Sequence, residues 1–136
     1  DRTAEYIKIK IGAAIPLKDE EFLDVKGRDL ITGLPKTIQL GSNEVLEAIN
    51  DSLMQIVNNV KAVLEKTPPE LSADIVDKGI VMTGGGSLIR EFPKLLSNYT
   101  LLPVYLAENA LESVVLGAGL ALDKLDVLRK IEKMER

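Results

Sequence analysis

The sequence predicts an α/β protein, because strand-like and helix-like segments alternate along its second half. The apolar run Ile80–Met82 leads into three glycines, a helix begins near Pro93, and a second strand-like segment, Pro103–Ala107, follows. A run that is apolar on both faces is typical of a buried parallel strand. The order strand, loop, helix, strand is half of an α/β layer. Ahead of this layer, the sequence predicts a hairpin and a long amphipathic helix.

The composition indicates one globular domain, or two subdomains that share a boundary. The 136 residues are 46% hydrophobic, which is enough to bury a core. The chain has neither cysteine nor histidine, which excludes thiol catalysis, disulfides, His-based triads and the usual structural zinc sites. A formal charge of -4 without a dense basic run argues against nucleic acid as a partner. No apolar run approaches the ~20 residues that span a bilayer.

The first segment, Thr3–Gly12, fits two structures. As a strand, Ile7, Ile9 and Ile11 alternate with lysines, and Glu5 and Lys8 face opposite ways. As a helix, the apolar residues form one stripe, and Glu5 and Lys8 become neighbours on one surface. The segment alone leaves the choice open, and a Glu–Lys pair at this spacing is commonly a surface ion pair.

The next segment, Glu20–Gly41, predicts an antiparallel hairpin with a long connection. Apolar residues alternate with polar ones on both sides of Gly27 and Gly33, which we interpret as turn residues.

A long amphipathic helix follows the hairpin. Ser42 is a candidate N-cap, and Pro68 and Pro69 mark the end. The apolar stripe consists of residues separated by three or four positions: Leu46, Ile49, Leu53, Ile56, Val60 and Val63. A stripe of this length with few charged flanks predicts a helix that lies on a core, in preference to a coiled coil.

Three more helices are expected. A short one covers Leu71–Asp77, and another covers Leu111–Leu122, where Gly117 and Gly119 suggest close packing against a neighbour. The last helix has Leu125, Leu128 and Ile131 on one side and charges elsewhere, which is typical of a solvated end helix.

The glycines of Ile80–Arg90 are the candidate binding loop. Glycines at the carboxyl end of a strand let the backbone approach a ligand and adopt φ values that other residues resist. The loop consists of Thr83, Gly84, Gly85, Gly86 and Ser87. It is neither a P-loop nor the dinucleotide GxGxxG pattern. On its own it predicts either a nucleotide contact or only a tight turn.

Several stretches together resemble one family, the bacterial actin MreB and its close paralogues. The strand with TGGGSLIR resembles the adenosine motif of the actin, sugar-kinase and heat-shock-chaperone superfamily. Further similarity, in the same order and spacing, lies in TAEYIKIKIG, VKGRDLITGLPKTI, EKTPPELSADI, LPVYLAE and LGAGLAL. The resemblance covers nearly the whole chain.

The resemblance implies the C-terminal half of an actin-like, ribonuclease H-like fold, with an incomplete sheet flanked by helices and a small α+β subdomain. Residues 1–60 correspond to subdomain IIB and residues 61–136 to the C-terminal part of subdomain IIA. The chain starts at Asp1 without a methionine, so we expect a fragment of a longer protein. The two phosphate loops (DxGxT and DxGG patterns) are not found, and no catalytic residue is assigned in this chain. Hydrolysis by the chain alone is not expected.

By this resemblance, the glutamate and lysine of TAExIK line an adenine pocket, which assigns Glu5 and Lys8 to the ATP or ADP site and selects the helix for Thr3–Gly12. The glycine loop, Thr83–Ser87, is the other part of the site. Magnesium is expected in the parent protein, with ligands outside this chain.

The family resemblance also implies a role and partners. The parent protein is expected to be a cytoplasmic, membrane-associated ATPase that assembles head to tail into filaments and guides wall elongation and rod shape. A RodZ-like regulator and the elongation machinery are expected partners, with membrane contact through the missing half. The alternative is a non-enzymatic interaction module that presents the IIA face to such regulators.

Three positions depart from the family pattern. Glu91 and Leu101 stand where glycine is expected, and Ala110 stands where proline is common.

Overall fold

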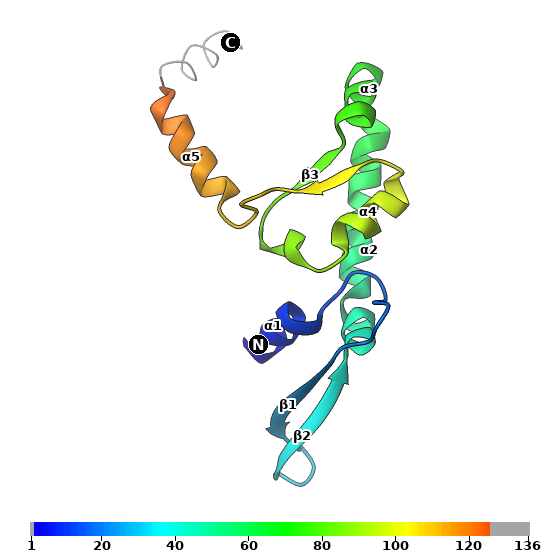
Figure 1. The fold of residues 1–136 in the computed structure, drawn as a ribbon, viewed down its shortest axis with the longest axis vertical. Coiled ribbons are helices and arrows are strands. Elements are labelled where there is room, and N and C mark those ends of the chain that lie inside the picture. Colours follow the sequence, from blue (N-terminus) through cyan, green and yellow to red (C-terminus); the bar gives the residue numbers. More distant parts are fainter. Residues whose placement is uncertain (1, 126–136) are drawn as a thin grey trace.

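The computed structural model describes residues 2–125, which form an elongated molecule with a hairpin at one end (Figure 1). In chain order, the elements are α1 (Arg2–Ile11), β1 (Phe22–Arg28), β2 (Pro35–Gly41), α2 (Ser42–Lys66), α3 (Pro69–Lys78), β3 (Ile80–Met82), the 3-10 helix η1 (Gly85–Leu88), α4 (Phe92–Thr100), β4 (Val104–Leu106) and α5 (Ser113–Asp123). The predicted α/β class is confirmed, and so is the helix at Thr3–Gly12. Within residues 2–125, no helix is long and apolar enough to cross a membrane.

The described residues form two separate two-stranded sheets. Strands β1 and β2 pair antiparallel, from Phe22 opposite Gly41 to Arg28 opposite Pro35, so the predicted hairpin is confirmed. Gly27 was expected in the turn, but it lies within β1 opposite Lys36. Strands β3 and β4 pair in parallel across the connection that contains η1 and α4.

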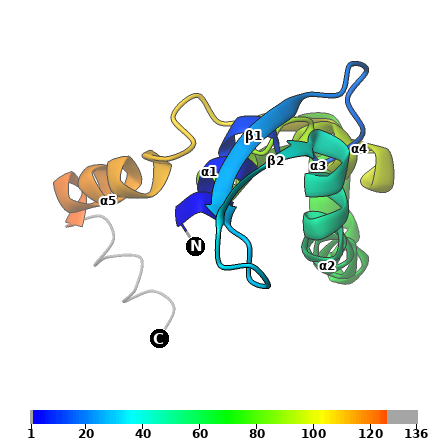
Figure 2. The same ribbon diagram turned by 90° about the horizontal axis from the view of Figure 1, so that it is seen from below.

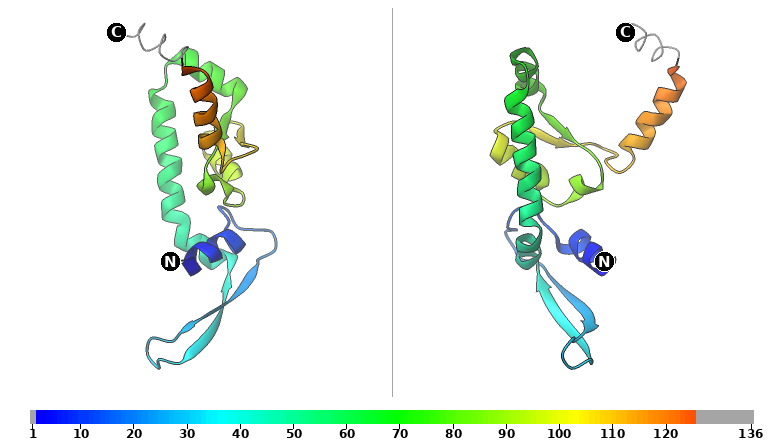
Figure 3. Two further views of the ribbon diagram at one scale, coloured as in Figure 1. Left: turned by 90° about the vertical axis from the view of Figure 1, so that its left-hand side faces the viewer. Right: turned by 180° about the vertical axis from the view of Figure 1, so that it is seen from behind.

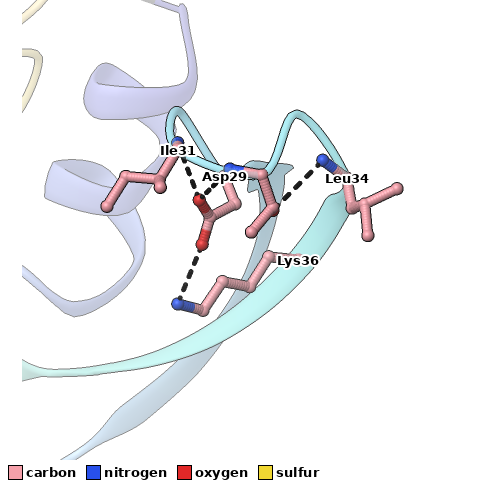
Figure 4. Close-up of polar contacts among 5 residues, drawn as sticks. Asp29, Ile31, Leu34 and Lys36 are labelled. Atoms are coloured by element: carbon pink, nitrogen blue, oxygen red, sulfur yellow. Dashed lines mark hydrogen bonds and ion pairs between the residues drawn. The ribbon is translucent and has the colours of Figure 1, made fainter.

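The hairpin tip is organised by one carboxylate (Figure 4). Asp29 Oδ1 accepts the backbone N–H groups of Ile31 at 2.9 Å and Thr32 at 3.0 Å, and Oδ2 accepts from Lys36 Nζ at 3.3 Å. These bonds hold the pKa of Asp29 below its usual range, first through the Thr32 and Ile31 amides and then through Lys36.

The long helix α2 has the expected length, but its start differs from the prediction by one position. The capping residue is Gly41, whose N–H donates to the Glu44 carboxylate at 2.9 Å. Ser42 is the first helical residue, and its hydroxyl accepts the Glu21 N–H at 3.2 Å. The serine therefore joins the helix to the chain before β1 instead of capping it.

The core lies where α2 crosses α4. Leu53 and Val57 of α2 pack with Phe92, Leu95 and Leu96 of α4 and with Ala14, and all six are buried. The predicted stripe is therefore correct at Leu53, and Leu46, Ile49 and Val60 are partly buried against this core, but the stripe is wrong at Ile56 and Val63, which are 44% and 66% exposed. Periodicity locates an apolar face, but the neighbouring element α4 determines which part of that face is covered.

Two segments are more exposed than the sequence predicts. Val81 of β3 is 64% exposed, so the strand is parallel but not buried on both faces. Helix α5 buries no residue, and added Cβ atoms at Gly117 and Gly119 would meet nothing within 4 Å. Figures 1 and 2 show α5 projecting from the rest of the molecule, so the expected close packing of its glycines is wrong for residues 2–125.

The expected division at residues 60 and 61 stays a prediction. Helix α2 runs through this position, and the core combines residues from both sides of it. Figure 3 shows α1 and the hairpin at one end of α2 and the β3–β4 layer alongside its other part. Of the predicted end helix, Leu125 is described, whereas Leu128 and Ile131 lie outside the described residues.

Candidate functional site

A cleft of about 440 Å³ separates α1 from the glycine loop. Its lining residues are Glu5, Lys8, Ile9, Gly12, Gly85, Gly86, Leu88, Ile89 and Leu111. Pockets of a few hundred cubic ångströms with few polar groups are typical of small-molecule sites. The cleft therefore brings together four of the seven residues that the sequence assigned to the nucleotide.

Helix α1 forms one wall. Because Arg2–Ile11 is helical, Glu5 and Lys8 lie one turn apart on the same side, and both line the cleft. They are the only charged residues among those that line it. None of the ion pairs within residues 2–125 includes either side chain, so the simple surface ion pair is not formed.

The glycine loop forms the opposite wall, and its three glycines differ. Gly84 has φ 83° and ψ 165°, a conformation that is essentially restricted to glycine. Neither Gly85 nor Gly86 has a positive φ, and both line the cleft. A Cβ at Gly85 would lie 3.2 Å from a Leu111 methyl carbon, whereas one at Gly86 would meet nothing within 4 Å.

The other three predicted residues shape the loop instead of lining the cleft. The Ala110 carbonyl accepts both the Gly84 N–H at 2.7 Å and the Thr83 hydroxyl at 3.1 Å. The buried Ser87 hydroxyl donates to the Gly84 carbonyl at 2.6 Å. These bonds fix the turn that places Gly85 and Gly86 at the cleft.

Sequence reasoning missed five lining residues. Ile9 and Gly12 follow Glu5 and Lys8 by one helical turn, so the helical periodicity of α1 already contained the signal. Leu88 and Ile89 continue the loop, and Leu111 comes from the turn after β4. No sequence pattern connects Leu111 to the loop, because the contact is tertiary.

The three positions at which the family resemblance led us to expect another residue lie beside the loop. Glu91 and Leu101 flank α4 with φ values of 61° and 59°, in the left-handed region that favours glycine. Ala110 is buried, and its carbonyl holds the loop, an interaction that proline would also allow. None of the three lines the cleft.

Comparison with known proteins gives the family. The protein-family model described as "MreB/Mbl protein" matches residues 1–130. The chain belongs to the MreB/Mbl family. It is 47% identical over 130 residues to the cell shape-determining protein Mbl of Bacillus subtilis, which covers 96% of this chain and 39% of Mbl. It is 44% identical over 127 residues to the cell shape-determining protein MreB of Escherichia coli, which covers 93% of this chain and 37% of that protein.

Solved structures agree with this assignment. MreB5 of Spiroplasma citri bound to ADP superposes with a TM-score of 0.86 at 34% identity, covering 96% of this chain and 39% of MreB5. The AMPPNP-bound structure of the same protein superposes with a TM-score of 0.85 at 33% identity, covering 97% of this chain and 39% of MreB5. The fold is therefore part of the actin-like fold of MreB, as the sequence predicted. The chain spans about two fifths of the length of these relatives.

Proposed function

We propose that this chain supplies the adenosine side of an ATP or ADP site in a filament-forming, actin-like protein of wall elongation and rod shape. The observation that carries the proposal is the cleft in which Glu5 and Lys8 lie opposite Gly85 and Gly86. Two structures of a relative with this fold contain ADP and AMPPNP, which supports an adenine nucleotide as the ligand.

The residues of the cleft fit such a ligand. Glu5 supplies hydrogen-bond acceptors and Lys8 supplies donors and a positive charge, while Ile9, Leu88 and Ile89 supply apolar surface for a ring. On the opposite wall, Gly86 leaves its backbone open, since a side chain there would project into empty space. The site therefore combines one cation, one carboxylate, apolar contacts and accessible main chain.

The chemistry of hydrolysis belongs to residues outside this chain. Phosphoryl transfer depends on phosphate-binding loops and a metal ion that neutralise the moving charge. Within residues 2–125, no group of three His, Cys, Asp or Glu side chains is placed to hold a metal. The role proposed for this chain is to bind and orient the nucleoside, with Mg²⁺ held elsewhere in the parent protein.

The test compares two Gly→Val variants in the whole protein, at the length of its relatives. Gly86→Val is expected to weaken ATP binding at least tenfold, about 1.4 kcal/mol, because the new side chain occupies the cleft. Gly27→Val is the matched control. A Cβ at Gly27 also meets nothing within 4 Å, but Gly27 lies on the hairpin and does not line the cleft. Isothermal calorimetry measures binding and thermal unfolding measures stability. Unchanged ATP affinity in Gly86→Val, with native stability, contradicts the proposal.

The alternative function, an interaction module, is favoured by helix α5. Its apolar residues Val114, Val115 and Leu120 are 75%, 66% and 64% exposed, which is unusual for an isolated soluble surface. Under this alternative, the chain presents the IIA face to a RodZ-like regulator or to the elongation machinery beneath the membrane, in the cytoplasm, without using a nucleotide. A chain that binds such a partner with the same affinity with and without ATP favours the module.

A further inference from the structure

Arg90 joins the two walls of the cleft without lining it. It follows Ile89 directly at the end of the glycine-loop wall. Its carbonyl accepts the Ala14 N–H at 2.8 Å, and it forms a parallel bridge with Ala13, in the chain that leaves α1. The backbone of Arg90 is therefore already attached to the α1 side of the cleft.

The side chain of Arg90 extends this connection to two more segments. Nη1 and Nη2 donate to the two carboxylate oxygens of Glu21 at 2.5 and 2.8 Å, and Nη2 also donates to the Lys10 carbonyl. Lys10 lies in the last turn of α1, where helical carbonyls lack partners within the helix. Glu21 immediately precedes β1. One guanidinium thus connects the end of α1, the start of the hairpin and the end of the glycine loop.

This geometry is suited to fixing orientation more than to adding stability. The Arg90 and Glu21 side chains are 37% and 47% exposed, and exposed ion pairs contribute little to folding. A bidentate Arg–carboxylate pair nevertheless fixes direction, because two parallel bonds align the two planar groups. In agreement with a formed pair, the Arg90 hydrogen bond lowers the pKa of Glu21.

We propose that Arg90 is a positioning residue for the nucleotide cleft, which sets how α1, with Glu5 and Lys8, faces Gly85 and Gly86. The inference rests on the nucleotide site proposed above. It differs from a direct contact, since Arg90 is outside the set of lining residues. Lysine at position 90 cannot replace it, because an ammonium cannot form the bidentate pair and reach the Lys10 carbonyl in the same fixed plane.

Nucleotide affinity is the first measurement, made on the whole protein. Arg90→Ala and Glu21→Ala are each expected to weaken ATP binding about tenfold, and the double variant is expected to be no weaker than Arg90→Ala, because both changes break the same connection. Arg90→Lys is expected to bind ATP about as weakly as Arg90→Ala does. Lys36→Ala is the matched control, since it breaks the ion pair with Asp29 on the hairpin, away from the cleft.

The second measurement reports orientation, and its first comparison is made without nucleotide. These 136 residues contain no cysteine, and any cysteine elsewhere in the whole protein is replaced by serine, so paired cysteines at Thr3 of α1 and Asn98 of α4 give one spin-label distance by pulsed electron resonance. In Arg90→Ala this distance distribution is expected to broaden, and saturating ATP is expected to narrow it again. Lys36→Ala is expected to leave it unchanged.

The outcomes separate the two proposals. If the unmodified protein does not bind ATP, the proposed function fails, while the spin-label distance still reports whether Arg90 orients α1. If the unmodified protein binds ATP and Arg90→Ala binds equally well, the positioning role is overturned and the proposed function stands. An unchanged distance distribution in Arg90→Ala also overturns it.

Discussion

Glu91 and Leu101 hold backbone conformations that glycine favours. Both have φ near 60°, one on each side of α4, and the family resemblance leads us to expect glycine at both positions. For a residue with a Cβ, the left-handed region costs roughly 1–2 kcal/mol. Glu91 has a surface contact with Lys94 at 3.5 Å, whereas the Leu101 side chain is 88% exposed. Leu101 is therefore the position where this cost has no evident compensation.

Leu101→Gly is expected to stabilise the protein by about 0.5–1 kcal/mol, which is the relief of the left-handed strain less the extra flexibility of glycine in the unfolded chain. The N–H of residue 101, which donates to the Ser97 carbonyl at 2.8 Å, is kept. Leu101→Ala is the control, because it removes the exposed side chain but keeps the Cβ. Chemical denaturation measures all three proteins. Equal stability of the glycine and alanine variants contradicts the strain argument.

The glycine loop shows what the sequence can and cannot predict for single residues. The sequence locates the loop, because three glycines directly after an apolar run are typical of a turn at the end of a strand. It cannot rank the glycines, since φ depends on the bonds that the Ala110 carbonyl makes with Thr83 and Gly84. Gly84 needs glycine for its conformation, and Gly85 and Gly86 instead leave space at the cleft.

At the scale of elements, helix α2 shows that the period of its apolar residues does not by itself determine which of them are buried. Val57 is completely buried and Val63 is 66% exposed, although both lie on the long helix that the sequence predicted. The predicted stripe included Val63 and omitted Val57. The cause is tertiary, because α4 covers only part of the length of α2.

This difference is measurable with one substitution at two sites. Val57→Ala is expected to lower the free energy of unfolding by about 2 kcal/mol, from the lost methyl burial and the cavity that remains. Val63→Ala is expected to change it by less than about 0.5 kcal/mol, since the methyl groups are already in water. Urea unfolding of both variants checks the pair. Similar losses at the two sites disagree with the described core.

The hairpin was predictable as an element, but the hydrogen bonds that fix its tip were not. Alternation and turn residues indicate two strands, whereas the Asp29 bonds to Ile31, Thr32 and Lys36 are local geometry that fixes the turn. These bonds hold Leu30 and Ile31 almost fully exposed, at 98% and 96%. The tip is therefore ordered without apolar burial, by a charge.

The tip is expected to lose order in acid. The folded pKa of Asp29 lies below its unfolded value of 3.8, so its stabilisation is complete above that value and is lost as the pH falls through the folded pKa. Protonation removes the charge that the Ile31 and Thr32 amides and Lys36 bind. An NMR titration of these amides checks this, with Asp29→Asn as a variant whose tip does not titrate. The prediction is contradicted if, in the unmodified chain, the amide shifts of Ile31 and Thr32 stay constant while Asp29 is protonated.

At the scale of the molecule, the fold class and the order of elements follow from the sequence, and the surfaces do not. Local signals such as Pro93, Pro68 and the hairpin alternation act within a few residues, and each was placed correctly. Exposure of Val81 and of α5 depends on which other segments are present to cover them. The chain spans about two fifths of its relatives' length, so sequence patterns for burial predict contacts that residues 2–125 do not make by themselves.

The chain of 136 residues, studied alone, is expected to self-associate. In residues 2–125, β3 pairs only with β4, which leaves the outer backbone groups of this parallel pair without a strand partner, beside the exposed Val81. Open edges of this kind favour pairing with a second copy.

Val81→Lys is expected to reduce association, because charge on an edge strand opposes such pairing. Val76→Lys on α3 is the control, since Val76 is 60% exposed, close to the 64% of Val81, but belongs to a helix. Light scattering over a range of concentrations measures the mass. A monomer at high concentration, or equal association of the two variants, shows that the β3–β4 edge does not drive assembly.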